Sequence, residues 1–562
     1  MCDVNEHHPA TLVEALEALS AVTDRGFTFV GYDGRDEVVS FAALHGRAAA
    51  VDAGLRRWGI RPGDRVALVL PDAIEFVPAF LGAVRGGAVP VPCYPPVAFG
   101  RLPEYVDHLA GILTVAEPTV LCTVEPLRDL LIALLPRVPS LRGIVTLSGL
   151  EAAEREVPAA VSSEPSDPVF LQFTSGSTAR PKGVVVTNES LAANTRVIMR
   201  DALRIQRADV GVSWLPLYHD MGLIGFVLAP IFVPTEVVFL PTMAFLGNPE
   251  LWFDQIHRRR ATVTFAPNFA FGLVRKRVRE SALTRWDLSC LRVVGCGAEP
   301  INPNTIESFF AMFEPTGLRP ESFLPCYGMA EATLAMAFPQ SGEGMRVDVV
   351  DEPAYRQKLT AWPDESDQGR YAFVGCGQAV AGHELAVLDE RGVPLAERAI
   401  GEIAFRGPSV TDGYFRNPDA TAEAFHGDWL LTGDLGYQAS GSLFITGRKK
   451  DLLVIRGRNS DPQHVEWVVE ALDGVREGNV VAFTRPGGDT EELVVVLEAS
   501  PDRGTSLSAD VRRRVHQVLQ LPVADVVTLE RGELLKTSSG KVQRQRVRRW
   551  YLAGGQDQST VA

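Results

Sequence analysis

Apolar residues in the first part of the chain recur first at helical spacing. Leu44, Ala48, Val51 and Leu55 follow one another at intervals of three or four residues and therefore share one face of a helix. Gly59 stands where that helix would end, because glycine readily adopts the backbone conformation that terminates helices. The pattern predicts an amphipathic helix that packs this face against a core.

Strand-like and helix-like runs then alternate. The apolar run RVALVL at 65–70 predicts a buried strand, residues 75–84 a helix, and AVPVPC at 88–93 the next strand. This order predicts a parallel sheet with helices on its faces. The same rhythm recurs at three later apolar runs, PVFLQF (168–173), TVTFAP (262–267) and LRVVGCG (291–297).

The pattern changes near Ala379. Short runs separated by Gly, Pro and Asp, AGHELAVLD at 381–389, GEIAFRG at 401–407 and GSLFITG at 441–447, predict a small antiparallel or barrel-like unit. Beyond the basic stretch TGRKKDLLVIRGRN at 446–459, helix-like and strand-like runs mix again.

We therefore expect an α/β fold with two domains. The first, residues 1–447, contains βαβ subdomains and a β-rich subdomain at about 376–447, and the second, residues 448–562, is a small mobile α+β domain. The boundary is placed within the basic stretch, where the two patterns meet.

Composition and charge restrict the class of protein. The chain has 562 residues, of which 46% are hydrophobic and 22% charged, and a formal net charge of -14, which argues against binding to nucleic acid or to an anionic membrane surface. The longest apolar stretch, 225–240, is interrupted by Pro230, Pro234 and Glu236, so no membrane span is expected. The N-terminal residues show no secretory signal, and seven cysteines without a CxxC pair favour reduced thiols in the cytoplasm.

The strongest chemical motif is TSGSTARPKGV at 174–184, directly after an expected strand. Glycines and small hydroxyl residues let backbone N–H groups approach an anion, and Lys182 adds a cation. The motif predicts a phosphate-binding loop, although it lacks the GxxxxGK spacing of P-loop nucleotide-binding proteins. A flexible surface turn is the alternative interpretation.

Three further motifs carry residues suited to nucleotide chemistry. In CYGMAEAT at 326–333, Glu331 is an oxygen ligand suited to Mg²⁺ and Tyr327 offers a flat face to a purine; an ordinary helix start is the alternative. In LLTGDLG at 430–436, Asp434 can accept both ribose hydroxyls, or can be a plain turn aspartate. In KTSSGKVQRQ at 536–545, Lys541 can act as a mobile cation, or can be one more cation of a solvated helix.

The order of these motifs resembles that of the acyl-adenylate-forming enzymes, and the similarity runs from about Thr11 to Tyr551. The chain is most similar to the fatty acyl-AMP ligases. Four stretches carry this narrower resemblance: PVPCYPP (90–96), LPLYHDMGLIG (215–225), GCGAEPI (295–301) and RGRNSDPQHVE (456–466). A segment at about 347–375 lies where those ligases carry an insertion.

The resemblance implies a role for each matching residue. Glu331, with Thr178 as a helper, would hold Mg²⁺; Lys541 would contact the substrate carboxylate and the α-phosphate; His219 would stand beside the acyl tunnel; and Lys450 would be the domain hinge. The residues implied to bind the β- and γ-phosphates are Thr174, Ser175, Gly176, Ser177, Thr178 and Lys182. Those implied to bind the rest of the nucleotide are Gly297, Ala298, Glu299, Tyr327, Gly328, Met329, Ala330, Asp434 and Arg448.

The implied reaction is ATP-dependent activation of a fatty acid to its acyl-adenylate, followed by transfer to the phosphopantetheine of an acyl carrier protein. The basic stretch KVQRQRVRRW at 541–550 is a candidate docking surface for an acidic carrier, or else a solvated helix face. Ser460-Asp461 departs from the His-Tyr usual in these ligases, and the polar stretch 351–370 is not closely matched.

Three other functions stay open. An acyl-CoA synthetase of the same fold would use coenzyme A as the acceptor, an amino-acid-activating enzyme would use another acid, and a catalytically silent relative would only bind nucleotide. Asp220 is compatible with recognition of an amino group, but the surrounding Tyr-His-Asp-Met-Gly is the fatty acyl pattern.

Overall fold

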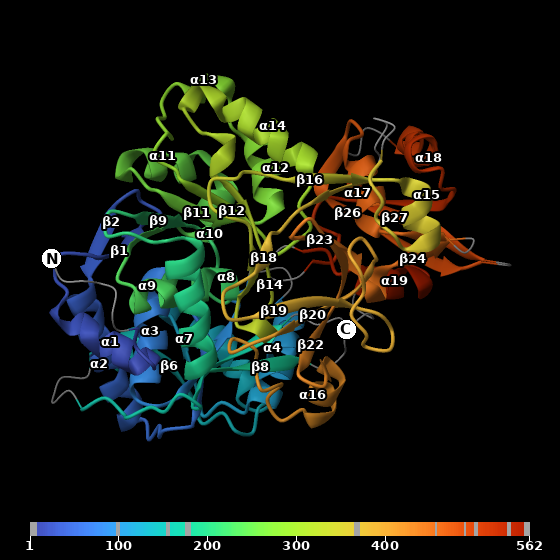
Figure 1. Ribbon diagram of the computed structural model, residues 1–562. Helices are drawn as coiled ribbons and strands as arrows, with labels where there is room; N and C mark the ends of the chain where they lie inside the picture. The colour runs from blue at the N-terminus through green and yellow to red at the C-terminus, as the bar shows by residue number, and fades with distance from the viewer. Residues whose placement is uncertain are drawn as a thin grey trace.

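The computed structural model comprises a large N-terminal domain and a smaller C-terminal domain, shown at the upper right of Figure 1. It describes residues 8–96, 102–152, 158–174, 181–364, 371–455, 458–487, 490–499, 504–536 and 541–555. The expected α/β fold is confirmed. Within these residues, no helix has the length and apolar character that a bilayer crossing requires.

The largest sheet has seven strands in the order β13-β12-β11-β9-β10-β1-β2, and only the β1–β2 pair is antiparallel. Its strands are β1 (Gly26–Val30), β2 (Asp36–Ser40), β9 (Val210–Ser213), β10 (Glu236–Phe239), β11 (Val263–Ala266), β12 (Val293–Cys296) and β13 (Phe323–Pro325). Helices of this part of the chain include α7 (Asn188–Arg196), α11 (Glu250–Arg259), α12 (Asn268–Arg277) and α14 (Pro303–Phe313). The strand expectations at 262–267 and 291–297 are confirmed as parallel neighbours.

A second, four-stranded parallel sheet has the order β4-β3-β5-β6. Its elements are α2 (Phe41–Arg57), β3 (Arg65–Val69), α3 (Ala73–Arg85), β4 (Val89–Cys93), α4 (Leu102–Ala116), β5 (Val120–Thr123), α5 (Glu125–Leu131) and β6 (Gly143–Thr146). The predicted apolar face of α2 is buried, and Gly59 follows the helix with φ 77°, as expected.

The strand predicted at 168–173 exists, but its inferred place in the parallel rhythm is wrong. It forms β7 (Pro168–Thr174), which pairs antiparallel with β8 (Lys182–Thr187) in a hairpin that begins at Thr174 and Lys182. Only seven residues separate the strands, too few for the helical crossover that parallel strands require. The hairpin places both ends of the predicted phosphate loop opposite each other.

The β-rich unit is antiparallel, as predicted. It contains β19 (Glu384–Leu388), β20 (Gly401–Arg406), β21 (Phe425–His426), β22 (Trp429–Ala439) and β23 (Ser442–Arg448), with α16 (Pro418–Ala424) at its edge. Asp434 was expected in a turn after a strand, but it lies inside β22, next to a register shift at Leu435 and Gly436. Gly433 (φ 71°) precedes it, so an irregular strand replaces the expected turn.

The C-terminal domain packs three helices, α17, α18 and α19, against a three-stranded sheet, β26-β27-β28. Its elements are β24 (Leu453–Ile455), β25 (Arg458–Ser460), α17 (Pro462–Glu470), β26 (Val475–Pro486), β27 (Glu491–Ala499), α18 (Gly504–Leu519), β28 (Val523–Leu529) and α19 (Arg544–Leu552). The chain leaves β23 at Arg448 and makes a short turn, η9 (Lys449–Asp451), before β24. The domain boundary between residues 447 and 448 stays a prediction.

The region expected to be an insertion folds as β16 (Val347–Val350), α15 (Glu352–Lys358) and β17 (Tyr371–Val374), with β16 and β17 paired antiparallel. In Figure 1, α15 lies beside the C-terminal domain. Tyr355 and Tyr371 belong to the same buried apolar cluster as Val465 and Leu497 of that domain. The insertion and the C-terminal domain thus share one core.

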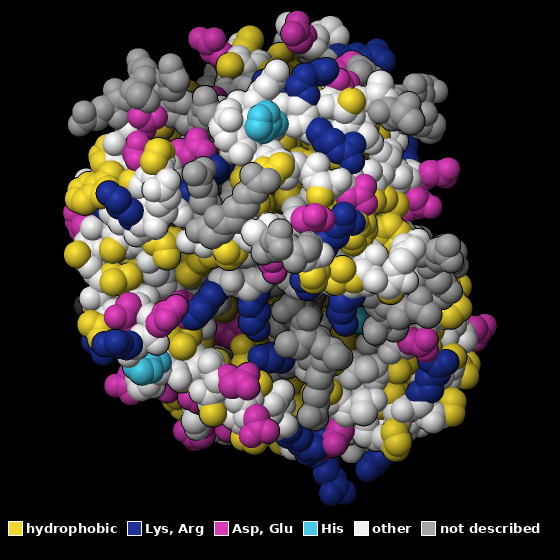
Figure 2. Space-filling model, turned by 90° about the vertical axis from the view of Figure 1, so that its right-hand side faces the viewer, with side chains coloured by type: hydrophobic (Ala, Val, Ile, Leu, Met, Phe, Trp, Pro, Cys, Tyr) yellow, Lys and Arg dark blue, Asp and Glu magenta, His cyan; other side chains and the backbone are white. Residues whose placement is uncertain are grey.

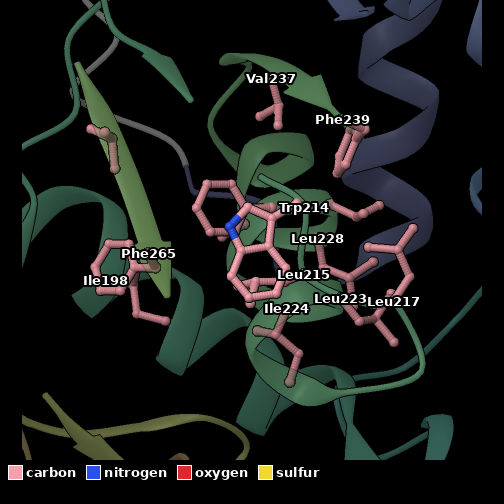
Figure 3. Packing of buried hydrophobic residues seen from close by; sticks show 14 of the residues in the cluster. Ile198, Trp214, Leu215, Leu217, Leu223, Ile224, Leu228, Val237, Phe239 and Phe265 are labelled. Carbon is pink, nitrogen blue, oxygen red and sulfur yellow. The ribbon is translucent and has the colours of Figure 1, made fainter. Parts of the chain in front are cut away.

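The segment that follows β9 passes through the main core before it reaches His219. Figure 3 shows Trp214 surrounded by apolar side chains of several elements, including Leu228 and Phe265. The Trp214 indole also stacks on Phe245 with ring centroids 3.8 Å apart. Because close packing leaves Trp214 little freedom, the backbone that continues to His219 is fixed in place.

Candidate active site

The predicted phosphate loop is only partly described. Thr174 and Lys182 face each other at the loop end of the β7–β8 hairpin, and the Lys182 ammonium lies 4.7 Å from the centroid of the Tyr414 ring. The predictions at Ser175, Gly176, Ser177 and Thr178 lie outside the described residues.

Glu331 lies in a short 3₁₀ turn, η8 (Ala330–Ala332), directly after β14 (Tyr327–Gly328) and Met329. Its side chain is buried, and its Oε1 accepts a hydrogen bond of 2.8 Å from the Tyr414 hydroxyl. Burial raises the pKa of Glu331, which the Tyr414 hydrogen bond opposes. A buried carboxylate of this kind is stabilised by a nearby cation.

The predicted adenine residues Gly297, Ala298 and Glu299 follow the carboxyl end of β12. A Cβ atom at Gly297 would lie 2.5 Å from the sulfur of Cys326, so only glycine fits there. Glu299 Oε1 accepts a 2.6 Å hydrogen bond from the Phe269 backbone N–H at the start of α12. This contact fixes the Glu299 carboxylate, whose pKa burial raises.

Asp434 contacts two other predicted nucleotide residues, Tyr327 and Arg448. Its Oδ2 accepts a 2.8 Å hydrogen bond from the Tyr327 hydroxyl, and its Oδ1 lies 3.0 Å from Nε of Arg448 on β23. Each carboxylate oxygen can accept two hydrogen bonds, so both retain an acceptor site for ribose hydroxyls. Tyr327 itself is buried, so little of its ring surface is accessible to a purine.

His219 and Asp220 stand at the start of α8 (Asp220–Leu223). Burial lowers the pKa of His219 to about 3, with a smaller effect of the Lys541 charge, so this imidazole is neutral at neutral pH. Its Nε2 atom is buried and lacks a hydrogen-bond partner within the described residues. Burial also raises the pKa of Asp220, which the Lys541 charge opposes.

Lys541 comes from the other domain, just before α19. Loss of hydration lowers the pKa of its ammonium, and the Asp220 and Glu299 carboxylates oppose this effect. Smaller effects come from Arg448 and Asp434. The Lys541 charge therefore acts on carboxylates at the predicted acyl, adenine and ribose positions, and its contact with the substrate carboxylate and the α-phosphate stays a prediction.

Exposed cations also line this side of the molecule. In Figure 2, Lys and Arg side chains gather around a central hollow. Arg448, Lys449 and Lys450 at the domain boundary are all exposed. Such a surface attracts a polyphosphate even though the chain as a whole has a net charge of -14.

The turn that contains the predicted hinge is tied to the C-terminal helix. The Gln545 side chain donates to the Lys450 carbonyl over 3.3 Å and to the Asp451 carboxylate over 2.9 Å. Any rotation about Lys450 that separates the turn from α19 must break both hydrogen bonds.

Tyr414 is the site residue that the sequence did not reveal. It precedes α16 and lies far in sequence from both Lys182 and Glu331, which its side chain contacts. The surrounding sequence GYFRNP is typical of a turn before a helix, since Asn417 caps α16 and Pro418 begins it. No local pattern signals its position.

The chain as a whole is similar to known proteins in both sequence and fold. The chain belongs to the AMP-binding enzyme family, which matches residues 19–415. A fatty acyl-adenylate ligase structure, from structural and functional studies of such ligases from E. coli and L. pneumophila, superposes with a TM-score of 0.92 at 33% identity, over 97% of this chain and 98% of that chain. The resemblance inferred from the motifs is confirmed.

Two curated relatives differ in the acceptor that their names imply. A Caulobacter vibrioides protein provisionally named an acyl-CoA synthetase is 36% identical, over 97% of this chain and 96% of its own. JamA of Moorena producens, a medium-chain-fatty-acid acyl-carrier-protein ligase, is 31% identical, over 98% of this chain and 96% of its own.

Proposed function

We propose that the chain uses ATP to activate a fatty acid as acyl-AMP and then transfers the acyl group to the phosphopantetheine of an acyl carrier protein. The observation that carries the first step is the position of Lys541, which comes from the C-terminal domain yet interacts electrostatically with the carboxylates of Asp220, Glu299 and Asp434. A cation in that place reduces the repulsion between two anionic substrates, a carboxylate and a triphosphate.

In this proposal the nucleotide lies across three parts of the N-terminal domain. The hairpin residues Thr174 and Lys182, with the intervening loop, hold the β- and γ-phosphates, while Asp434 and Arg448 hold the ribose. The adenine lies beside 297–299 and 327–330.

A magnesium ion fits beside Glu331. Within the described residues, no group of three or more His, Cys, Asp or Glu side chains could bind a metal together. Mg²⁺ on a nucleotide commonly takes one or two carboxylates and otherwise phosphate and water oxygens. A single buried carboxylate such as Glu331 suits this mode, with Thr178 as a predicted helper. When bound, the ion would neutralise part of the charge on the phosphates.

The main task of the protein in this reaction is to position the substrate carboxylate and ATP. An oxygen of the substrate carboxylate attacks the α-phosphorus, the bond from that phosphorus to the bridging oxygen breaks, and pyrophosphate leaves. Lys541 stabilises charge at the reacting oxygens, and the neutral His219 lies beside the acyl chain. In the second step the carrier thiol attacks the acyl carbon, its proton is lost to solvent, and AMP leaves.

The first test is acid-dependent pyrophosphate release. Purified protein with ATP and Mg²⁺ is offered fatty acids of increasing length, an aromatic acid and amino acids. Release with fatty acids but not with amino acids would support the proposal. Release with amino acids alone would favour an amino-acid-activating enzyme, and no release with any acid would favour a catalytically silent relative.

The insertion supports carrier protein over coenzyme A as the acceptor. In related synthetases the C-terminal domain rotates between the two steps, and here buried contacts hold it to the insertion. The Arg356 guanidinium donates to the Leu519 carbonyl over 2.8 Å, and the Tyr355 hydroxyl donates to Asp461. The name of the Caulobacter relative keeps coenzyme A as the second candidate. Acyl transfer measured with coenzyme A and with a phosphopantetheinylated carrier protein separates the two.

The carrier docking surface is smaller than the basic stretch suggested. Arg544 is paired with Glu466 over 2.8 Å, and Arg546 is half-buried, with its charge acting on the pKa of Tyr94 and His108 of the N-terminal domain. Arg549 is exposed on α19. The docking proposal therefore rests on Arg549 and excludes Arg544 and Arg546.

Reversing the charge at Arg549 tests this surface. Arg549→Glu should slow acyl transfer to an acidic carrier protein roughly ten-fold at low salt, because a steering charge is lost, while pyrophosphate release stays unchanged. Arg514→Glu, on the exposed face of α18, is the matched control. Equal slowing of both steps, or equal slowing in both variants, would exclude a docking role.

A further inference from the structure

The segment of residues 409–415, between β20 and α16, is hydrogen-bonded to the strand that leaves the predicted phosphate loop. The Phe415 N–H donates to the Gly183 carbonyl over 2.7 Å, and the Val185 N–H donates to the Gly413 carbonyl over 3.2 Å. This segment therefore extends the β7–β8 hairpin by a short third strand.

The same segment is bonded to the turn that carries Glu331. The Thr411 N–H donates to the Glu331 carbonyl over 2.8 Å, and the Thr333 hydroxyl donates to the Ser409 carbonyl over 2.7 Å. One short piece of chain thus fixes the distance between the phosphate-loop hairpin and the η8 turn.

Tyr414 projects from this segment to a charged side chain on each neighbour. Its hydroxyl donates to Glu331 Oε1 over 2.8 Å, and its ring centroid lies 4.7 Å from the Lys182 ammonium. The backbone of Tyr414 is itself held, because its N–H donates to the Thr421 hydroxyl over 3.0 Å. Gly413 has φ 139°, and a Cβ there would lie 2.4 Å from Thr421.

We propose that Tyr414 is a positioning residue for the metal–triphosphate site, orienting the Glu331 carboxylate with its hydroxyl and restraining Lys182 with its ring. The inference rests on the proposed function and assigns a role to a residue outside the recognised motifs. Both target side chains are long and flexible, so a single rigid aromatic group that contacts both reduces the entropy lost when the substrate binds.

The geometry favours this role over a purely structural one. A hydrogen bond at Oε1 restrains the carboxylate, and Oε2 would stay available to a metal ion. An ammonium over an aromatic ring is attracted to the face of the ring but is not consumed by an ion pair, so it stays available to a phosphate. A tyrosine needed only for folding would not be expected to contact both predicted ligands.

Two substitutions separate the contributions of the hydroxyl and the ring. Tyr414→Phe keeps the ring over Lys182 but removes the hydrogen bond to Glu331, and Tyr414→Leu removes both. ATP binding is measured by isothermal titration calorimetry without fatty acid, once with Mg²⁺ and once with EDTA. Pyrophosphate release as a function of Mg²⁺ concentration gives a second readout.

We expect Tyr414→Phe to weaken ATP binding about ten-fold with Mg²⁺, the effect of losing one hydrogen bond to a charged group, and to raise the Mg²⁺ concentration needed for half-maximal activity. In EDTA its ATP affinity should match that of the wild type. Tyr414→Leu should also weaken binding in EDTA, by a few-fold, because the lysine loses its restraint.

Tyr437→Phe is the matched control, since it removes a buried hydroxyl that donates to Asp348 over 2.7 Å. It should leave both ATP affinities unchanged. Tyr414→Phe binding within two-fold of the wild type, or weakened equally with and without Mg²⁺, would overturn the inference. Absence of pyrophosphate release by the wild type would instead count against the proposed function.

Discussion

At the scale of single residues, the site depends on carboxylates that are each held by at least one hydrogen-bond donor. Asp434 accepts from Tyr327 and lies beside Arg448, Glu331 accepts from Tyr414, and Glu299 accepts from a backbone N–H. These partners orient the carboxylates before any substrate arrives. A preorganised site of this kind costs little reorganisation when charge develops in the reaction.

Asp434 should contribute to binding of the nucleotide more than to the chemical step. We expect Asp434→Asn to raise KM for ATP roughly ten-fold or more with kcat within a few-fold of the wild type, because charge-assisted hydrogen bonds to the ribose are weakened in both the ground and transition states. Initial rates of pyrophosphate release over a range of ATP concentrations give both constants.

Asp348 offers a matched control for this change. Like Asp434 it accepts from a tyrosine and an arginine, namely Tyr437 over 2.7 Å and Arg398 over 3.1 Å, but it lies in the insertion. Asp348→Asn should reduce stability without changing KM for ATP. If both variants raise KM alike, the assignment of Asp434 to the ribose is wrong.

At the scale of elements, the contact between the insertion and the C-terminal domain contains a buried ionisable pair. Asp461 Oδ2 lies 3.9 Å from Nδ1 of His464, and the hydroxyl of Tyr355 donates to the same carboxylate. Burial raises the pKa of Asp461 from 3.8 to about 7 and lowers the pKa of His464 to about 3. The Ser460-Asp461 pair, noted as a departure from related ligases, therefore belongs to this contact.

The raised pKa of Asp461 makes the contact sensitive to pH. Between pH of about 4 and 7 the folded state holds a proton that the unfolded state releases, so this group contributes less stability as pH rises through that window. Asp461→Asn stays neutral throughout. Its melting temperature relative to the wild type should therefore increase by about 2 °C or more from pH 5 to pH 8.

Comparing the variant with the wild type at each pH removes the opposing contribution of His464. Asp129→Asn, at an exposed position on α5, should show no such change in its difference from the wild type. A constant difference between Asp461→Asn and the wild type from pH 5 to pH 8 would contradict the raised pKa.

Local patterns predicted the elements better than their pairing. The spacing of apolar residues located α2, β3, β4 and β11, because each depends mainly on burial of one face or one run. Whether β7 pairs parallel or antiparallel depends on the length of the loop after it, and the apolar run itself carries no such information. For the same reason Asp434 was predicted in a turn, whereas it lies within β22.

The candidate site could be predicted only where a motif is contiguous in sequence. Tyr414 could not be predicted as a site residue, because Lys182 and Glu331 are distant from it in sequence and contact it only in the folded chain. The use of Arg544 and Arg546 in internal contacts was likewise hidden, since charge patterning does not distinguish a paired arginine from an exposed one.

At the scale of the whole molecule, two features join the domains. One is the apolar core that the insertion shares with the C-terminal domain. The other is the electrostatic interaction of Lys541 with carboxylates of the N-terminal domain. A TM-score of 0.92 over nearly all of a fatty acyl-adenylate ligase requires both domains to superpose together. The described arrangement of the two domains is therefore shared with that ligase, and the role of Lys541 in adenylation stays a proposal.

The most direct test of the account is acid-dependent exchange of labelled pyrophosphate into ATP, which reports adenylation without any acceptor. The wild type should catalyse exchange that depends on a fatty acid, and Lys541→Ala should lose on the order of 10²-fold or more of it, as expected for removal of a preorganised charge contact. Lys276→Ala, an exposed lysine on α12, should exchange at the wild-type rate. Exchange by Lys541→Ala within a few-fold of the wild type would contradict the central claim.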